Sequence, residues 1–344
     1  MKYLPQLDGL RALAIILVFL HHAFHVPLLW SGVDLFFILS GYLITNILMR
    51  DRERLSFRTM IGRFYLRRAE RILPAYLIFL VLAFFFLRPD LERLWVYYVF
   101  FLQNIPYAFQ MVHTFPLFPL WSLAVEQHFY LFWPVLVYYL PRRWLAPSMI
   151  GLLVAVPVLR GLCTPLFATS DAIYCLTPFR IDTMAAGALA ALVLPHCKPL
   201  RAIRIAQVAM VLAAVAYLLL GMHPWFRRPA NTVVFNSLAY SLNILILGGL
   251  FVWAALAENT WLTRLLSTPL LRGLGRISYM FYLLHLLVLA ETVKYLGSRG
   301  WVVAAAFAIT AGLATLSWFA VEKPVLSLSA SHRRAAAAKS AVAL

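Results

Sequence analysis

Residues 10–49 read LRALAIILVFLHHAFHVPLLWSGVDLFFILSGYLITNILM, which is two apolar runs separated by a short break. Each run has about the length that crosses a lipid bilayer as a helix, roughly 20 residues. A cleavable signal peptide has a shorter apolar core and no second span directly behind it. We therefore interpret this stretch as a pair of transmembrane helices.

Apolar runs of similar length recur throughout the 344 residues. Hydrophobic residues make up 63% of the chain and charged residues 12%, about half the share of roughly 25% that is typical of a soluble domain. This composition excludes a disordered chain, a coiled coil and an ordinary cytosolic enzyme. We expect an all-α, polytopic membrane bundle over residues 1–325 and a basic, Ala-rich cytoplasmic tail over 326–344. The ten expected transmembrane helices lie at 10–29, 32–49, 72–87, 121–140, 148–163, 179–195, 205–222, 233–257, 274–296 and 301–320.

One further apolar segment, 94–112, determines the topology. It contains Gln103, Asn104 and Pro106, which are unfavourable in a helix that faces lipid but are tolerated where protein shelters the backbone. We therefore expect this segment to be re-entrant or to lie on the outer face.

The basic loops indicate the orientation. With ten crossings, the loops 141–143 and 198–204 and the basic segment 50–71 fall on the same side as both termini. Because basic residues gather on the cytoplasmic side of membrane proteins, we predict that both termini are cytoplasmic, in the plasma membrane of a bacterium. Arg227 and Arg228 fall on the outer side and count against this orientation.

The formal net charge is +17, which in a soluble protein would suggest a nucleic-acid partner. Here the cytoplasmic loops account for the charge, so we expect no nucleic acid. The three cysteines have no metal or disulfide spacing, and His21 and His25 lack a third ligand for zinc, so we expect no metal. The chain has no P-loop, GxGxxG or GxSxG motif, which argues against ATP-driven, dinucleotide and serine-hydrolase chemistry.

Segment 50–71 contains eight arginines against three acidic residues, a net charge of +5. Arg68 and Arg71 are three residues apart and share a helix face, and a new membrane helix can begin at Pro74. Guanidinium groups suit bidentate contact with phosphate or carboxylate, so this pair is a candidate anion site. Contact with lipid headgroups is the alternative, and it accounts for some of these arginines.

Ionisable residues inside the first apolar run indicate function, because they are costly in lipid. From Arg11 to His22 a helix turns about 20° past three full turns and rises roughly 16 Å, so both residues lie on one stripe. Asp8 and His25 are about 40° off this stripe, and His21 points about 100° away. His22 is therefore a candidate general base, a role for which imidazole is suited near neutral pH. A structural histidine bonded to a neighbouring helix is the alternative.

The second apolar run begins with small residues and an acid. Gly32, Ser40 and Gly41 allow another helix to approach closely, and packing alone would explain them. Asp34 at the outer edge is harder to explain by packing.

Glu126 lies a few residues inside another run and needs a partner or a proton there. We consider either a substrate or Arg180, which opens the run that also contains Asp182. Arg180 and Asp182 can also pair locally, and a structural ion pair is an equal alternative to a substrate contact.

Four residues of the run 274–296 form a further polar stripe. Gly275, Ser278, Tyr282 and His285 form one stripe, because Tyr282 lies about 40° and His285 about 20° from Ser278 around the helix. His285 is a second candidate base, and a satisfied core histidine is the alternative.

Seven stretches together resemble the acyltransferase type 3 family of integral membrane acyltransferases. They occur in the family's order and cover essentially the whole chain. These stretches are LDGLRALAIILVFLHH (7–22), GVDLFFILSGYLI (32–44), FYLRRAERILPAY (64–76), WSLAVEQHFYLFWP (121–134), FRIDTMAAGALAAL (179–192), LGRISYMFYLLH (274–285) and VEKP (321–324).

The resemblance implies ten spans and the transfer of an acyl group, often acetyl, from cytoplasmic acyl-CoA to a hydroxyl of an extracytoplasmic or lipid-linked glycan. Acyl-CoA is then a co-substrate, and no bound cofactor is expected. Members of the family act on lipopolysaccharide, peptidoglycan, exopolysaccharide and small glycosides. The chain stops soon after its tenth expected span without a GDS motif, so we expect no added SGNH domain.

Carried over residue by residue, the resemblance implies that the essential histidine is His22, the first-span arginine is Arg11 and the Arg-x-x-Arg pair is Arg68 and Arg71. The Trp-Ser and Val-Glu elements fall on Trp121, Ser122 and Glu126. Gln127 stands where a second acid is common, so a role for two carboxylates is in doubt.

These residues lead to one working hypothesis. The acyl-CoA phosphates bind Arg11, Arg68 and Arg71, and His22 deprotonates the acceptor, directly or after forming an acyl-enzyme. The catalytic residues are then His22 and Glu126, the acceptor contacts are Asp34, Trp121, Ser122, Arg180 and Asp182, and the secondary candidates are Ser278 and His285.

Two other functions fit a bundle with buried charges. A glycolipid transporter or flippase would move its substrate without consuming acyl-CoA, and a non-catalytic scaffold would tolerate loss of Arg68. The expected partners are the lipid bilayer and a glycan or glycolipid acceptor. The sequence does not specify the oligomeric state.

Overall fold

The computed structural model describes residues 3–112, 114–297 and 299–328, and within them the chain is helical with no strand. The bundle consists of α1 (Pro5–Phe24), α2 (Gly32–Arg52), α3 (Phe57–Val99), α5 (Leu120–Tyr139), α6 (Arg142–Cys163), α8 (Ile181–Val193), α9 (Pro199–Gly221), α10 (Val233–Leu256), α12 (Pro269–Leu296) and α13 (Gly300–Ser317). Short helices α4 (Asn104–Ala108), α7 (Asp171–Cys175) and α11 (Trp261–Leu266) lie in the connections, and a π-helical turn, Trp318–Glu322, follows α13. The predicted tail lies outside the described residues from 329 onward.

The prediction of a polytopic helical membrane protein is confirmed. Eight helices in the described part of the chain are long and apolar enough to cross a membrane. A shorter apolar helix covers Ile181–His196, and α5 is 20 residues long but contains Glu126, Gln127 and His128 near its middle. These ten helices coincide, in order, with the ten expected spans.

The segment 94–112 forms no helix of spanning length in its described residues. It contains the end of α3, a turn and the five-residue α4. Asn104 is buried, and its side-chain amide donates to the Cys175 carbonyl oxygen (3.3 Å) and the Thr177 hydroxyl (3.2 Å). Polar side chains are tolerated here because protein, not lipid, surrounds them.

The start of α3 differs from the expectation that a new helix begins at Pro74. The helix begins at Phe57 and continues through Pro74. Proline removes only one backbone N–H donor. The long apolar run after Pro74 favours a continuous helix, because a helix pairs the remaining backbone groups within the membrane. Arg68 and Arg71 therefore lie on the same helix as the span that follows them.

Glycines allow the central helices to approach closely. A Cβ added to Gly41 of α2 would lie 2.1 Å from the carbonyl oxygen of Met184 in α8, and one added to Gly275 of α12 would lie 1.9 Å from that of Asp8 in α1. Neither position has room for a side chain, as expected for small residues at helix contacts in membranes.

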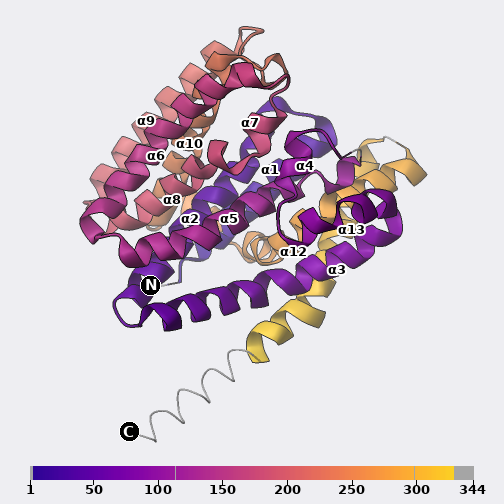
Figure 1. The fold of residues 1–344 in the computed structure, drawn as a ribbon, viewed down its shortest axis with the longest axis horizontal. Coiled ribbons are helices and arrows are strands. Elements are labelled where there is room, and N and C mark those ends of the chain that lie inside the picture. Colours follow the sequence, from indigo (N-terminus) through magenta and orange to yellow (C-terminus); the bar gives the residue numbers. More distant parts are fainter. Residues whose placement is uncertain (1–2, 113, 298, 329–344) are drawn as a thin grey trace, which may run out of the picture.

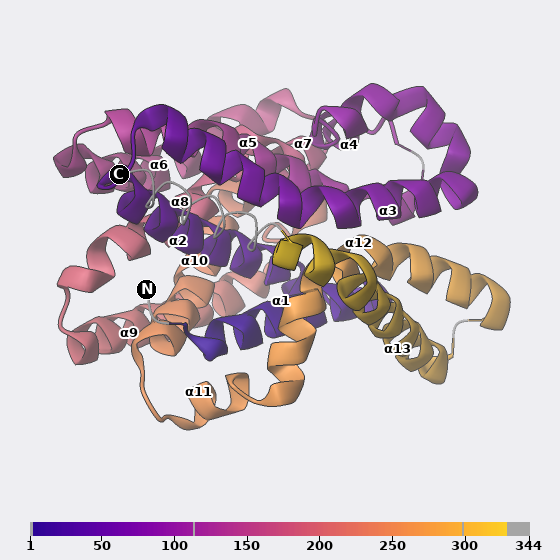
Figure 2. The same ribbon diagram turned by 90° about the horizontal axis from the view of Figure 1, so that it is seen from below.

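Figures 1 and 2 show α1 and α2 in the interior of the bundle, with α6, α9 and α10 on one side and α12 and α13 on another. α2 packs on α8, α1 packs on α12, and α3 runs along a flank where it contacts α2, α5 and α12. The helices that carry most of the predicted site residues thus meet around one region.

Candidate active site

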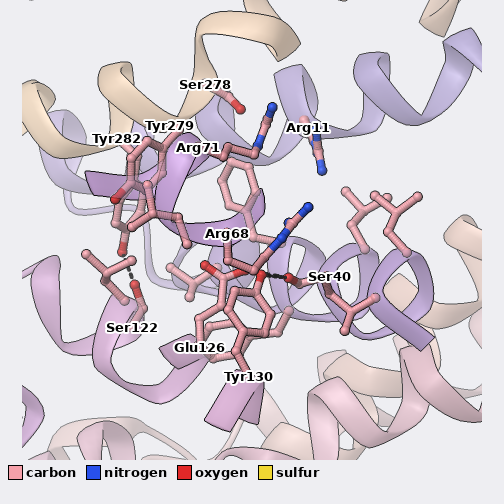
Figure 3. Close-up of a pocket in the computed structure, with 18 of the residues that line it drawn as sticks. Arg11, Ser40, Arg68, Arg71, Ser122, Glu126, Tyr130, Ser278, Tyr279 and Tyr282 are labelled. Atoms are coloured by element: carbon pink, nitrogen blue, oxygen red, sulfur yellow. Dashed lines mark hydrogen bonds between the residues drawn. The ribbon is translucent and has the colours of Figure 1, made fainter. Parts of the chain in front are cut away.

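A cavity of about 110 Å³ lies between α1, α2, α3, α5 and α12. Arg11 enters it from α1, and Arg68 and Arg71 enter it from α3 (Figure 3). We call it the arginine pocket. Its other polar lining residues are Ser40, Ser122, Glu126, Tyr130, Ser278, Tyr279 and Tyr282. Six predicted site residues from four helices thus lie around one cavity: Arg11, Arg68, Arg71, Ser122, Glu126 and Ser278.

The arginines of this pocket lack matching acids. Among the described residues, no carboxylate lies within ion-pair distance of Arg68 or Arg71, and Asp8 approaches Arg11 only to 4.0 Å. Figure 3 shows the three guanidinium groups on the same side of the cavity. A partly buried positive charge without a counterion is unfavourable, so the pocket favours an anionic ligand.

Glu126 is held by hydroxyl groups. Its carboxylate accepts hydrogen bonds from Ser40 of α2 and from Tyr130, one turn further along α5 (Figure 3). Arg180, considered as its ion-pair partner from the sequence, pairs with Asp34 instead. The geometry therefore places Glu126 in the pocket wall, where a substrate can reach it.

Ser122 and Tyr282 form the side of the pocket away from the arginines (Figure 3). Their hydroxyl oxygens are 2.6 Å apart, and they lie 3.0 and 2.9 Å from the carbonyl oxygen of Pro119. This network fixes Tyr282, whose backbone carbonyl oxygen in turn accepts a hydrogen bond from the next candidate side chain.

That side chain is His285, and it lies against His22. Nδ1 of His285 is 2.6 Å from the Tyr282 carbonyl oxygen, and because a carbonyl only accepts, Nδ1 carries the proton and Nε2 of the neutral ring is an acceptor. Nδ1 of His22 is 3.2 Å from this Nε2 and 2.9 Å from the Val18 carbonyl oxygen. Since both neighbours are acceptors, His22 has its proton on Nδ1 and a lone pair on Nε2.

The Nε2 atom of His22 is open. No group within the described residues forms a hydrogen bond with it, and it is not among the buried polar atoms that lack a partner. His22 thus makes the structural hydrogen bonds of the alternative interpretation through Nδ1 and keeps Nε2 available. A general base needs a lone pair in this state.

Asp34, Arg180 and Asp182, together with Arg160, form two fully buried ion pairs. Arg180 pairs with Asp34, and Arg160 lies 2.9 Å from Asp182. None of these residues belongs to the lining of the arginine pocket. The expected local pairing of Arg180 with Asp182 is therefore wrong, because each pairs with a residue of another helix. The geometry favours structural ion pairs, and a direct contact with an acceptor stays a prediction.

Aromatic rings surround the Arg180 guanidinium, and Trp121, also expected to contact the acceptor, is one of them. The Trp121 ring is buried, with its centroid 5.3 Å from Arg180 Cζ and 4.6 Å from the Tyr174 centroid. The other rings around this cation are Trp30, Phe37, Tyr174 and Tyr240.

Two tyrosines of the arginine pocket were not identified from the sequence. Tyr130 follows Glu126 by four residues, a spacing that places both on one helix face, and this signal could have identified it. Tyr279 has a buried hydroxyl without a partner among the described residues, and nothing in its sequence context indicated that it lines the cavity.

Metal chemistry has no visible basis in the described residues. Within them, no three His, Cys, Asp or Glu side chains gather as a metal site. The expected absence of a metal stays a prediction.

Residues 4–321 match a protein family described as an acyltransferase domain. The chain is 28% identical to the "Peptidoglycan O-acetyltransferase" of Listeria monocytogenes over 94% of this chain and 56% of that protein. It is 30% identical to the "Putative peptidoglycan O-acetyltransferase" of Bacillus subtilis over 94% of this chain and 55% of that protein. It is 28% identical to a "Putative O-acetyltransferase" of Staphylococcus aureus over 86% of this chain and 52% of that protein.

The chain spans about half the length of these curated relatives. No solved structure gives a significant match.

Proposed function

The chain belongs to the acyltransferase type 3 family, whose domain it matches over residues 4–321, and on this premise we propose that it is a membrane O-acyltransferase. In this proposal the chain moves an acyl group, acetyl in the first instance, from acyl-CoA to a hydroxyl of an extracytoplasmic or lipid-linked glycan.

One observation supports this proposal most strongly. A pocket with three arginines, two of which have no carboxylate within ion-pair distance among the described residues, reaches Tyr282, and the backbone of Tyr282 holds the histidine that orients His22. An anion site and a base with a free lone pair are thus connected by one residue, as transfer from a phosphorylated thioester requires.

The arginine pocket suits the acyl-CoA arm better than the whole molecule. Its volume of about 110 Å³ is below the range of roughly 300–1,000 Å³ for drug-sized ligands, so the nucleotide would stay at the mouth. Guanidinium–phosphate hydrogen bonds would hold it there. Arg11 and His22 are separated along α1 by roughly 16 Å, a distance that an extended pantetheine arm spans.

Transfer then needs one base. The acceptor hydroxyl gives its proton to Nε2 of His22, its oxygen forms a bond with the thioester carbonyl carbon, and the carbon–sulfur bond breaks. The CoA thiolate leaves and takes the proton back from His22. In the two-step alternative, Nε2 attacks the thioester carbonyl carbon and the CoA thiolate leaves. The acceptor oxygen then bonds to that carbon as the carbon–nitrogen bond breaks, and the hydroxyl proton passes to the thiolate.

His285 would act by positioning. Its Nε2 accepts from Nδ1 of His22 and keeps the His22 lone pair on Nε2, while the Tyr282 carbonyl keeps the His285 proton on Nδ1. During proton transfer this acceptor would also stabilise the positive charge that forms on His22.

The positions of the basic residues support the proposed orientation, and the names of two relatives support the proposed acceptor. We place the arginine-rich segment 50–71 and both termini in the cytoplasm of a bacterium, because basic residues gather there and acyl-CoA is supplied there. Two relatives are named as peptidoglycan O-acetyltransferases, which makes peptidoglycan the first glycan to test.

Mass spectrometry of surface glycans from cells with and without the gene tests the proposal. We expect loss of an acetyl mass from a glycan whose amount is unchanged. A glycan that disappears from the surface without any loss of acetylation would instead indicate the transporter.

A further inference from the structure

A second cavity, of about 1000 Å³, lies at the end of α1 away from Arg11. Its walls come from the end of α1, the turn before α2, the residues before α7 and the connection between α9 and α10. Figure 1 shows α7 and the α9–α10 connection at the same end of the bundle. We call it the aromatic cavity and define it by His21, Trp30, Asp171, Tyr217, Phe226 and Arg228.

His21 places this cavity next to the proposed base. It lines the cavity, and its ring centroid is 5.1 Å from that of His22. Nδ1 of His21 is 2.9 Å from the Val26 carbonyl oxygen and therefore donates to it, so Nε2 of the neutral ring is an acceptor. The aromatic cavity thus reaches His21 at one end of α1, and the arginine pocket reaches Arg11 at the other.

An ion pair forms the polar part of the cavity. Arg228 is 3.3 Å from one oxygen of Asp171, and the other oxygen accepts from Gln110 (3.0 Å) and Thr169 (3.3 Å). The side chains of Arg228 and Asp171 are 26% and 25% exposed, so both can still reach a ligand.

Arg228 also stacks on Tyr174, with Cζ 4.0 Å from the ring centroid. Burial raises the pKa of the Tyr174 hydroxyl, so this ring stays neutral and Asp171 is the acid that balances the arginine. These contacts explain why an arginine lies on the side that the charge rule disfavours.

Aromatic rings form the opposite part of the cavity. Tyr217 packs on Phe226 at 5.5 Å between centroids, and Trp30 is only 5% exposed. Arg180, which pairs with Asp34, packs on the Trp30 ring, with Cζ of Arg180 5.7 Å from the ring centroid. The buried pair predicted to contact the acceptor therefore supports the wall of this cavity.

We propose that the aromatic cavity is the acceptor subsite and binds the pyranose rings of a glycan, with ring hydroxyls on Asp171 and Arg228 and an apolar ring face against the wall that Trp30 and Tyr217 form together with the more exposed Leu218 and Met222. This inference rests on the proposed function and adds the place and chemistry of acceptor binding. A charge-balanced Asp–Arg pair suits uncharged hydroxyls, because it offers donors and an acceptor together. The aromatic rings provide a rigid apolar surface, and the volume leaves room for more than one sugar ring.

Direct binding tests this inference without requiring turnover. The full chain in nanodiscs is titrated with soluble, uncrosslinked peptidoglycan strands by calorimetry, without acetyl-CoA. We expect Arg228→Ala and Tyr217→Ala to weaken binding about tenfold or more, the effect of losing hydrogen bonds to a charged group or a ring contact. Arg299→Ala is the matched control, because Arg299 is exposed in the α12–α13 connection and lies outside the cavity.

The outcomes separate this inference from the proposed function. Strands that do not bind the wild-type chain, or that bind both cavity variants as tightly as wild type, overturn the subsite. Binding that weakens in the cavity variants but not in the control supports it, whether or not transfer occurs. Failure of the wild-type chain to transfer acetyl from acetyl-CoA overturns the enzyme proposal separately. Tyr217→Ala leaves the Asp171–Arg228 ion pair intact, so it keeps the test valid if Arg228→Ala does not fold.

Discussion

Replacing Arg71 with alanine tests whether the arginine pocket holds acyl-CoA. In the described structure no carboxylate lies within ion-pair distance of Arg71 or Arg68. The buried Glu322, whose charge attracts Arg71 at longer range, keeps its hydrogen bond from Ser317 when Arg71 is replaced. The fold should therefore keep its stability. The lost interaction is a hydrogen bond between a guanidinium and a phosphate, worth about 1.5–3 kcal/mol. That corresponds to a rise of roughly 10- to 100-fold in the KM for acetyl-CoA.

The assay follows CoA release by the chain in nanodiscs at varied acetyl-CoA concentration. We expect the KM for acetyl-CoA to rise in Arg71→Ala and Arg68→Ala while kcat and the glycan KM change little. Arg63→Ala is the matched control, because Arg63 is on the same helix, is exposed and does not line the pocket. The rise should shrink at high ionic strength, because salt screens the charge of the wild-type site.

An unchanged KM for acetyl-CoA would refute donor binding by these arginines. If Arg68→Ala and Arg71→Ala both keep the wild-type KM for acetyl-CoA, the arginines do not bind the donor, and contact with lipid headgroups becomes their better explanation. An equal rise in Arg63→Ala would point to a general surface-charge effect.

Three further predictions follow from single contacts. His285→Leu should lower kcat about 10²-fold or more with an unchanged KM for acetyl-CoA, and His285→Gln, whose amide oxygen can replace Nε2 as acceptor, should recover part of it; equal losses in both variants would argue against positioning. Gly275→Ala should destabilise the bundle by about 1–3 kcal/mol, because its Cβ would overlap the α1 backbone, whereas Gly273→Ala in the same helix has free space and should keep the wild-type melting temperature. Glu126→Gln should reduce transfer more than Tyr130→Phe, measured as acetyl incorporation into glycan, since only the first removes the carboxylate; the reverse order would contradict a role for the acid.

Much of the fold could be predicted because its causes are local. The length of each apolar run sets the helices, and polar residues in 94–112 indicate a segment that protein must shelter. The start of α3 was not predicted in this way, because Pro74 in isolation is a helix-start signal, whereas the apolar run that follows it favours a continuous helix.

In the candidate site, too, relations within one helix could be predicted and contacts between helices could not. Helix geometry placed Arg11 and His22 on one stripe and Ser278 and His285 on another, since each relation lies within a single helix. That the two stripes face each other is a contact between residues 263 positions apart in the sequence, which helical periodicity does not specify. The pairing of Arg180 with Asp34, 146 positions apart, escaped prediction for the same reason.

The most direct test of the account is acetyl transfer by His22→Ala. Purified chain in proteoliposomes is given radiolabelled acetyl-CoA and uncrosslinked peptidoglycan strands, and label in the glycan is counted. His196→Ala serves as control, because His196 is exposed and lines neither the arginine pocket nor the aromatic cavity. The account predicts that His22→Ala inserts and binds acetyl-CoA normally yet loses transfer by a factor of about 10²–10⁴, while the control transfers like wild type. Undiminished transfer by His22→Ala would contradict it.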